Sequence, residues 1–184
     1  MRCLARYPVI GEGKLFFIAI DNGNFIVAKN LFTLSEKWRV PKREWDYVSV
    51  GVMYNYYLLA HWNGKLFTAW SYLGGRISSH LSATGTVPWR VEFDDVIGTI
   101  PTVGDGIVVI GFLNKGKITA LSADDGKIPW NFTTDSPVMS SPAYSSGCFY
   151  FGASNGVAYA VSSGGKELWH TKLGSIVTTS AAAF

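Results

Sequence analysis

The side chains able to do covalent or metal chemistry are few in this chain of 184 residues and lie far apart. Cys3 and Cys148 form no Cys-x-x-Cys pair, and no histidine stands at metal-ligand spacing from either. His80 and His170 are distant from one another and have no matching acidic partners in the sequence, so neither indicates nucleophilic catalysis. We therefore predict two unpaired thiols and assign no catalytic, cofactor-binding or metal-binding residue.

Three further polar patterns have simple structural interpretations. Asp124 and Asp125 precede Gly126, a combination typical of a tight turn, and we interpret the aspartates as turn residues rather than metal ligands. Asn131 opens an Asn-x-Thr sequon and is a possible glycosylation site if the protein is secreted. Residues 38–45 carry three cations beside a glutamate, which we interpret as a solvated loop rather than a nucleic-acid site.

Charge and hydropathy exclude several partners. Sixteen basic and thirteen acidic residues give a formal charge of +3 with no block of like charges, so we expect no nucleic-acid partner. The longest apolar runs, 15–20 and 107–113, are far shorter than the ~20 residues of a membrane-spanning helix, so we expect no membrane span. Residues 11–13 interrupt the N-terminal region before a sustained apolar stretch, and we expect no secretory signal within it.

A repeat positions the remaining residues. Four segments end in tryptophan with a similar lead-in, and roughly 40–50 residues separate one from the next; these are SEKW at Trp38, TVPW at Trp89, KIPW at Trp130 and KELW at Trp169. A turn followed by an apolar run precedes each lead-in, as in PVIGEG, PTVGDG and PAYSSG. Twenty glycines between short apolar runs favour strands over helices.

Each unit contains four short strands, which in the third unit we place at 98–103, 107–112, 117–123 and 127–132. Tandem four-stranded units of this length are typical of β-propeller blades. We therefore predict an all-β fold of about four antiparallel blades plus one strand. The expected blades are 4–43, 47–94, 97–135 and 137–174, with an extra strand at 176–184, all in a single partial propeller spanning 1–184.

These units resemble the quinoprotein-like propellers, the repeat family named for pyrroloquinoline quinone. The resemblance rests on an eleven-residue motif, Ala-x-Asp/Asn-x-x-x-Gly-x-x-x-Trp, which segment 120–130 matches with serine at the acidic position. The other units match in part, because Leu34 stands where the first unit should have glycine and the fourth unit is one residue short. The residues that carry the motif are Ala28, Trp38, Gly85, Trp89, Ala120, Gly126, Trp130, Ala160 and Trp169.

The resemblance implies that these tryptophans pack each blade against the next, a structural rather than ligand-binding role. Trp62 falls outside the repeat phase, and either the central channel or the core is a suitable place for it. Rings of this family generally have six to eight blades. We therefore expect an open arc, part of a larger ring, whose partner is the missing blades or another protein.

Three functions are compatible with the resemblance. The preferred one is a non-catalytic interaction or scaffold module, outside the cytoplasm, without a cofactor. The alternative is part of a quinone-dependent dehydrogenase that holds pyrroloquinoline quinone and calcium on the channel axis. Many such enzymes carry adjacent cysteines, which are absent here. A regulatory propeller attached to another enzyme is the third possibility.

Overall fold

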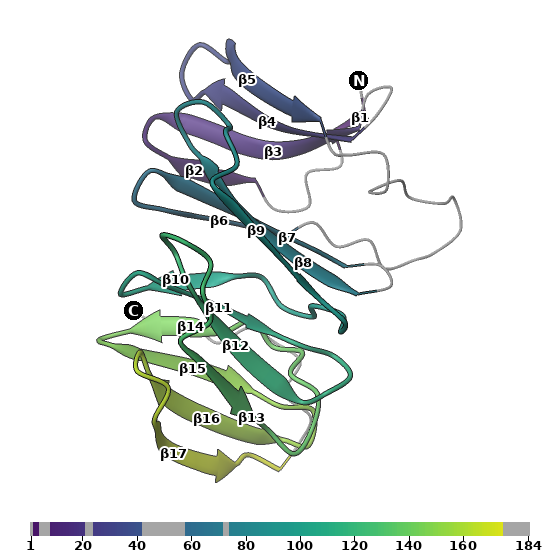
Figure 1. Cartoon of the computed structure of the whole chain (residues 1–184), viewed down its shortest axis with the longest axis vertical. Coiled ribbons are helices and arrows are strands. Elements are labelled where there is room, and N and C mark those ends of the chain that lie inside the picture. The colour runs from purple at the N-terminus through teal and green to yellow at the C-terminus, as the bar shows by residue number, and fades with distance from the viewer. Residues whose placement is uncertain (1, 4–7, 21–23, 42–57, 72–73, 175–184) are drawn as a thin grey trace.

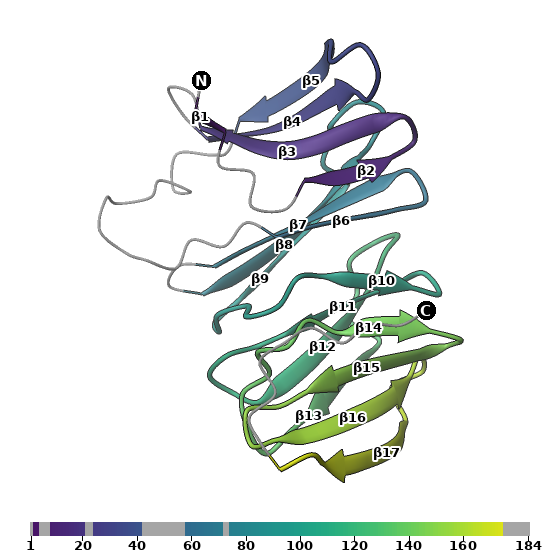
Figure 2. The same cartoon turned by 180° about the vertical axis from the view of Figure 1, so that it is seen from behind.

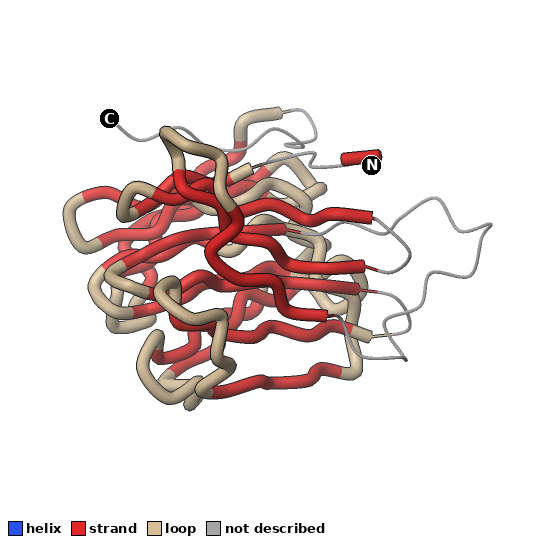
Figure 3. Tube along the Cα trace, turned by 90° about the horizontal axis from the view of Figure 1, so that it is seen from above, coloured by secondary structure: helices blue, strands red, loops and turns tan. Residues whose placement is uncertain are grey.

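The regular structure of the described part of the chain consists of β-strands (Figures 1 and 3). The computed structural model describes residues 2–3, 8–20, 24–41, 58–71 and 74–174. The strands within them are β1 (Arg2–Cys3), β2 (Val9–Gly11), β3 (Lys14–Ile20), β4 (Asn24–Asn30), β5 (Glu36–Pro41), β6 (Leu58–Trp62), β7 (Lys65–Ser71), β8 (Gly75–Leu81), β9 (Trp89–Phe93), β10 (Thr102–Gly104), β11 (Ile107–Gly111), β12 (Lys117–Ser122), β13 (Trp130–Thr133), β14 (Ala143–Ser145), β15 (Cys148–Gly152), β16 (Val157–Ser162) and β17 (Glu167–Lys172). Helices are absent from these ranges.

The strands form four antiparallel sheets, which we number in chain order. Sheets two, three and four are β6–β9, β10–β13 and β14–β17, each with its strands in sequence order. In sheet one, β1 and β2 both pair with β3, so the inner strand is split in two. The sheets follow one another as an open arc, with sheets one and four at opposite ends of the molecule (Figures 1 and 2). The predicted all-β, open partial propeller is therefore confirmed.

Each inner strand returns through a two-residue hairpin. Both residues of every such turn have positive φ, as type I′ turns require; the pairs are Glu12–Gly13, Asn63–Gly64, Asp105–Gly106 and Ser146–Gly147. Type I′ turns match the right-handed twist of the strands they join, which explains why an apolar strand directly follows each turn signal in the sequence.

In the third unit two strands begin three or more residues later than predicted, and each of the four strand ends differs by one residue. β10 begins at Thr102 instead of residue 98, and β13 begins at Trp130 instead of residue 127. Pro101 and Pro129 immediately precede these strands. Proline has no N–H to donate to the ladder, so in each case regular pairing begins at the residue that follows the proline.

The hydrophobic core lies in layers between successive sheets. Between sheets two and three, Phe67 and Ile77 pack with Val108, Ile110 and Leu121, all fully buried. Similar clusters join sheet one to two and sheet three to four. Each such side chain contributes about 1.5–3 kcal/mol on burial, so contacts between sheets, as well as ladders within them, stabilise the arc.

Leu34, in the loop between β4 and β5, has a φ of 57°, a conformation that glycine adopts freely and leucine does not. Its side chain is exposed, so it gains little by burial. We expect Leu34→Gly to raise the free energy of unfolding by about 1 kcal/mol, measured by urea unfolding. Lys37→Gly on the adjoining exposed strand should lower it by roughly 0.5–1 kcal/mol. A decrease for both variants would contradict this explanation.

Candidate functional site

Three tryptophans reach from their own sheet to the next one. Each indole Nε1 donates a hydrogen bond to a backbone carbonyl in the loop between the third and fourth strands of the following sheet. The pairs are Trp38 with Ser82 (2.9 Å), Trp89 with Ala123 (3.2 Å) and Trp130 with Ser163 (2.8 Å). This hydrogen bond fixes the orientation of the indole, which apolar packing of the ring alone would not do.

A glycine lies against each of these rings. Gly85, Gly126 and Gly165 have φ values of 77°, 73° and 85°. A Cβ added at these positions would lie 2.8 Å from the Trp38 ring, 2.8 Å from the Trp89 ring and 2.5 Å from the Trp130 ring. Real Cβ atoms essentially never approach so closely. Each glycine therefore serves two needs, a left-handed turn and room for the preceding sheet's tryptophan.

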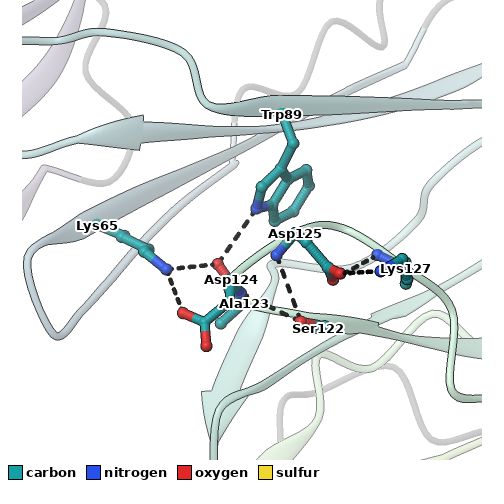
Figure 4. Close-up of polar contacts among 7 residues, drawn as sticks. All are labelled: Lys65, Trp89, Ser122, Ala123, Asp124, Asp125 and Lys127. Carbon is teal, nitrogen blue, oxygen red and sulfur yellow. Dashed lines mark hydrogen bonds and ion pairs between the residues drawn. The ribbon is translucent and has the colours of Figure 1, made fainter.

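Polar contacts hold the receiving loop in sheet three (Figure 4). Lys65 Nζ, from β7, donates to the Ala123 carbonyl at 3.0 Å and to Asp124 Oδ1 at 2.5 Å. Asp125 accepts from Lys127 at 2.7 Å, and its N–H reaches Ser122 Oγ. The Lys127 and Ser122 hydrogen bonds lower the pKa of Asp125 to about 2. Both aspartates thus take part in contacts that fix this turn and its link to sheet two.

The motif alanines stand directly opposite the tryptophans within each sheet. Ala28 pairs with Trp38, Ala120 with Trp130 and Ala160 with Trp169, and all three alanines are fully buried. Trp169 differs from the other motif tryptophans because 46% of its surface is exposed. Its ring contacts Tyr150 of the same sheet, and its indole N–H makes no hydrogen bond to any described residue.

Ser79 occupies the alanine position in sheet two, opposite Trp89. It is fully buried, and among the described residues its Oγ has no hydrogen-bond partner. We expect Ser79→Ala to raise the free energy of unfolding by about 1 kcal/mol, because it removes an unsatisfied buried hydroxyl. Ser82→Ala is the control: it loses a 2.9 Å bond from Ser82 Oγ to Glu12 and should destabilise. Thermal unfolding of both variants checks the opposite signs.

A polar cluster, which the sequence did not reveal, lies on the face of sheet two that is turned toward sheet one. Thr68 Oγ1 is 3.1 Å from His80 Nε2, and Arg90 Nε donates to Ser78 Oγ at 3.3 Å. Arg76 pairs with Glu92 at 3.1 Å. The only available signal was His80, which stands where the third unit has Leu121 in the ungapped alignment of the two units.

His80 should make stability depend on pH. Burial lowers its pKa from 6.5 to about 4. The hydrogen bond with the Gly85 carbonyl raises this pKa, and the positive charge of Arg90 lowers it. At a pH between these two pKa values, His80 is protonated in the unfolded chain but not in the folded chain. The free energy of unfolding should therefore fall as the pH drops, by about 2 kcal/mol from about pH 7.5 to about pH 5. Urea unfolding of the natural chain and of His80→Gln checks this, because the glutamine variant should lose most of that slope.

The remaining candidates are dispersed. Asn131 is exposed on β13, with its Oδ1 accepting from Thr119 at 2.7 Å. His170 does have an acidic partner, contrary to the sequence interpretation, because its Nδ1 lies 2.7 Å from Glu167 Oε1. Cys148 is an unpaired cysteine, and Trp62 is half-buried against the core between sheets two and three. Residues 42–57 and the predicted strand 176–184 lie outside the described residues.

Within the described ranges, no three His, Cys, Asp or Glu side chains gather as a metal site would require. A search of the same ranges finds no helix long and apolar enough to cross a membrane.

Known structures share this fold. A europium-containing methanol dehydrogenase superposes with a TM-score of 0.72 at 16% identity, covering 93% of this chain and 42% of that one. The computationally designed protein Ika8 gives a TM-score of 0.71 at 17% identity, with 94% of this chain and 50% of that one covered. Identities this low establish the propeller fold alone.

Sequence comparison is more specific. Outer membrane protein assembly factor BamB of Yersinia pestis is 30% identical over 98 residues, which are 50% of this chain and 25% of that protein. The chain thus matches about a quarter of that relative's length. The family model described as outer membrane protein assembly factor BamB matches residues 73–183. Since this is more than half of the sequence, the chain belongs to that family of propellers with pyrroloquinoline-quinone-like repeats.

Proposed function

We propose that the chain is a set of blades from a non-catalytic β-propeller that binds other proteins outside the cytoplasm. The observation that carries the proposal is the docking geometry, in which indole, glycine and carbonyl join each sheet to the next. In this proposal the motif residues have the structural role expected for them: Ala28, Trp38, Gly85, Trp89, Ala120, Gly126, Trp130, Ala160 and Trp169. The match to the assembly-factor family supports a scaffold role.

The residue types also support an interaction role. Lys65 and Trp89 both donate to the Ala123 carbonyl of sheet three, so their polar contacts connect one sheet to another. A calcium ion with a quinone would need several oxygen donors together, and the described residues bring no such group of carboxylates together. As in the sequence interpretation, the proposal assigns no cofactor, and Asn131 remains a candidate for glycosylation in a secreted form.

The proposal can be tested by site-specific photocrosslinking in the protein's own host. A photoreactive residue at Phe32, which is 85% exposed, should yield adducts with a discrete partner protein, whereas the same residue at buried Val108 should not. In parallel, the purified protein is mixed with pyrroloquinoline quinone, Ca²⁺ and an alcohol, and dye reduction is followed. Quinone-dependent turnover, or equal adducts at both positions, would overturn the proposal in favour of an enzyme or of non-specific contact.

A further inference from the structure

The interface between sheets one and two has a different composition from the other two. Large side chains fill the outer part of those interfaces, as in the ring pairs Phe93–Phe112 at 5.0 Å and Phe132–Tyr159 at 5.6 Å. In sheet four, Phe151 pairs with Tyr159 across the ladder. The same ladder position in sheet two holds Thr68 and Ser78. At this ladder position sheet two therefore has two short polar side chains where sheet four has two aromatic rings.

The replacement leaves a cavity of about 50 Å³, which we name the seam cavity. The polar side chains that line it are Thr68, Arg76, Ser78, His80 and Arg90. Arg76 and His80 are 7% and 3% exposed. A space of this size accommodates a carboxylate group or about three or four water molecules.

An apolar groove adjoins the seam cavity and shares Val40, Pro41, Val87 and Arg90 with it. Its volume is about 480 Å³, and Pro88 and Trp89 complete its wall. One wall is the end of β5, with Val40 and Pro41, and the other is the segment that leads into β9, with Val87 and Pro88. The groove thus suits an extended segment with apolar side chains.

Arg90 is the cation beside the seam cavity for which the described residues supply no carboxylate. Arg76 pairs with Glu92, whose side chain is 63% exposed and reaches out toward solvent. Arg90 donates to Ser78 Oγ, and in the described part of the chain no carboxylate pairs with it. A guanidinium presents five donors in a fixed fork that matches a carboxylate. The cavity therefore offers the Arg90 guanidinium to a carboxylate that the described residues do not supply.

We propose that the seam cavity binds the carboxylate of a glutamate or aspartate on an extended segment of a partner protein, with the neighbouring apolar side chains seated in the groove. Arg90 is the residue that recognises the carboxylate, and Ser78, which accepts from Arg90 Nε at 3.3 Å, positions its guanidinium. This inference rests on the proposed interaction function and names the chemistry of one partner segment. Charge complementarity and the paired apolar walls select this occupant.

Titration of the full chain with short peptides tests the proposal. The probe is acetyl-Val-Glu-Val-amide, and acetyl-Val-Gln-Val-amide is its uncharged match. Binding is followed through the Nε–Hε resonance of Arg90 in ¹H–¹⁵N spectra. We expect the glutamate peptide to bind about tenfold more tightly than the glutamine peptide, because a charged acceptor strengthens the hydrogen bonds of the fork.

Variants separate this site from general attraction. Arg90→Gln should remove the preference for glutamate, and Arg90→Lys should keep only part of it. Arg39→Gln is the matched control: it removes the same charge from nearby β5, where Arg39 pairs with Glu36 at 2.8 Å, and should leave the preference intact. Folding of each variant is checked by its amide spectrum, and Arg90→Lys serves if Arg90→Gln does not fold.

Equal binding of both peptides, no shift of Arg90, or equal loss in the Arg39 variant would overturn the proposal. Acetate that binds as tightly as the glutamate peptide would overturn the assignment to a protein segment and indicate a small-anion site. These outcomes leave the crosslinking and turnover results unaffected, so failure of this inference is distinguishable from failure of the proposed function.

Discussion

Replacing Trp89 with alanine is expected to lower the free energy of unfolding by about 3–5 kcal/mol. The indole is 9% exposed, and a ring of this kind buries on the order of 200 Å² of apolar surface. The substitution also leaves the Ala123 carbonyl without its indole donor, although Lys65 still donates to it. Because Trp89 belongs to the core shared by sheets two and three, the loss falls on the contact between sheets. Urea unfolding followed by circular dichroism measures it.

Trp169→Ala provides the matched control for this prediction. It removes the same side chain at the same phase of the repeat, but from a position that is 46% exposed and has no indole hydrogen bond among the described residues. Its cost should stay within about 1 kcal/mol. Similar costs at both positions would show that the tryptophans act through their own sheets, and not by docking on the next.

Docking of this kind has a direction, from each tryptophan to the loop of the following sheet. Sheet one carries Leu34 at the loop position where the other sheets have glycine, and that residue already has a left-handed φ. A tryptophan arriving there would meet a leucine side chain, whereas Gly126 leaves room for the Trp89 ring. Trp169 is therefore not suited to dock on sheet one of the same chain or of a second copy. The docking surface that it fits is a loop with glycine.

The repeat was predictable from sequence because it depends on residue types with few substitutes. Only glycine allows both the left-handed φ and the approach of an indole at Gly85 and Gly126, and only tryptophan combines a large ring with an N–H donor. A fixed phase between these residues therefore indicates propeller blades. The sequence also predicted a tight turn at Gly126, although the motif alone did not say which sheet's tryptophan meets which glycine.

The seam cavity was not predictable because it depends on contacts between strands far apart in sequence. The cavity forms because three strand residues, Thr68, Ser78 and Arg90, lie on one face of sheet two, next to Val40 of sheet one. Nothing in the sequence distinguishes them from other strand residues. The sequence indicated no catalytic role for His80, and its low pKa follows from burial, which only the fold shows. His170 and Glu167 lie three residues apart on one strand, where strict alternation would put them on opposite faces; a bulge near Val161 changes that register.

Gly126→Ala should lower the free energy of unfolding by about 3–4 kcal/mol. Two costs add here, about 1 kcal/mol for a side chain at positive φ and about 2–3 kcal/mol for forcing the Trp89 ring from its place. The added Cβ would lie 2.8 Å from two atoms of that ring, and the ring is held by its hydrogen bond to the Ala123 carbonyl. The loop cannot relieve the clash without moving the acceptor of the same bond.

Gly13→Ala separates these two costs. Gly13 has a φ of 68°, close to the 73° of Gly126, but a Cβ there meets nothing within 4 Å. Gly13→Ala should lower the free energy of unfolding only by the cost of a side chain at positive φ, about 1 kcal/mol. The difference between the two variants, measured by urea unfolding, therefore reports the contact between glycine and tryptophan. A double variant with Trp89→Ala should shrink the cost of Gly126→Ala to that of Gly13→Ala, since the ring that it strikes is gone. Additive costs would instead place the effect of Gly126 within its own loop.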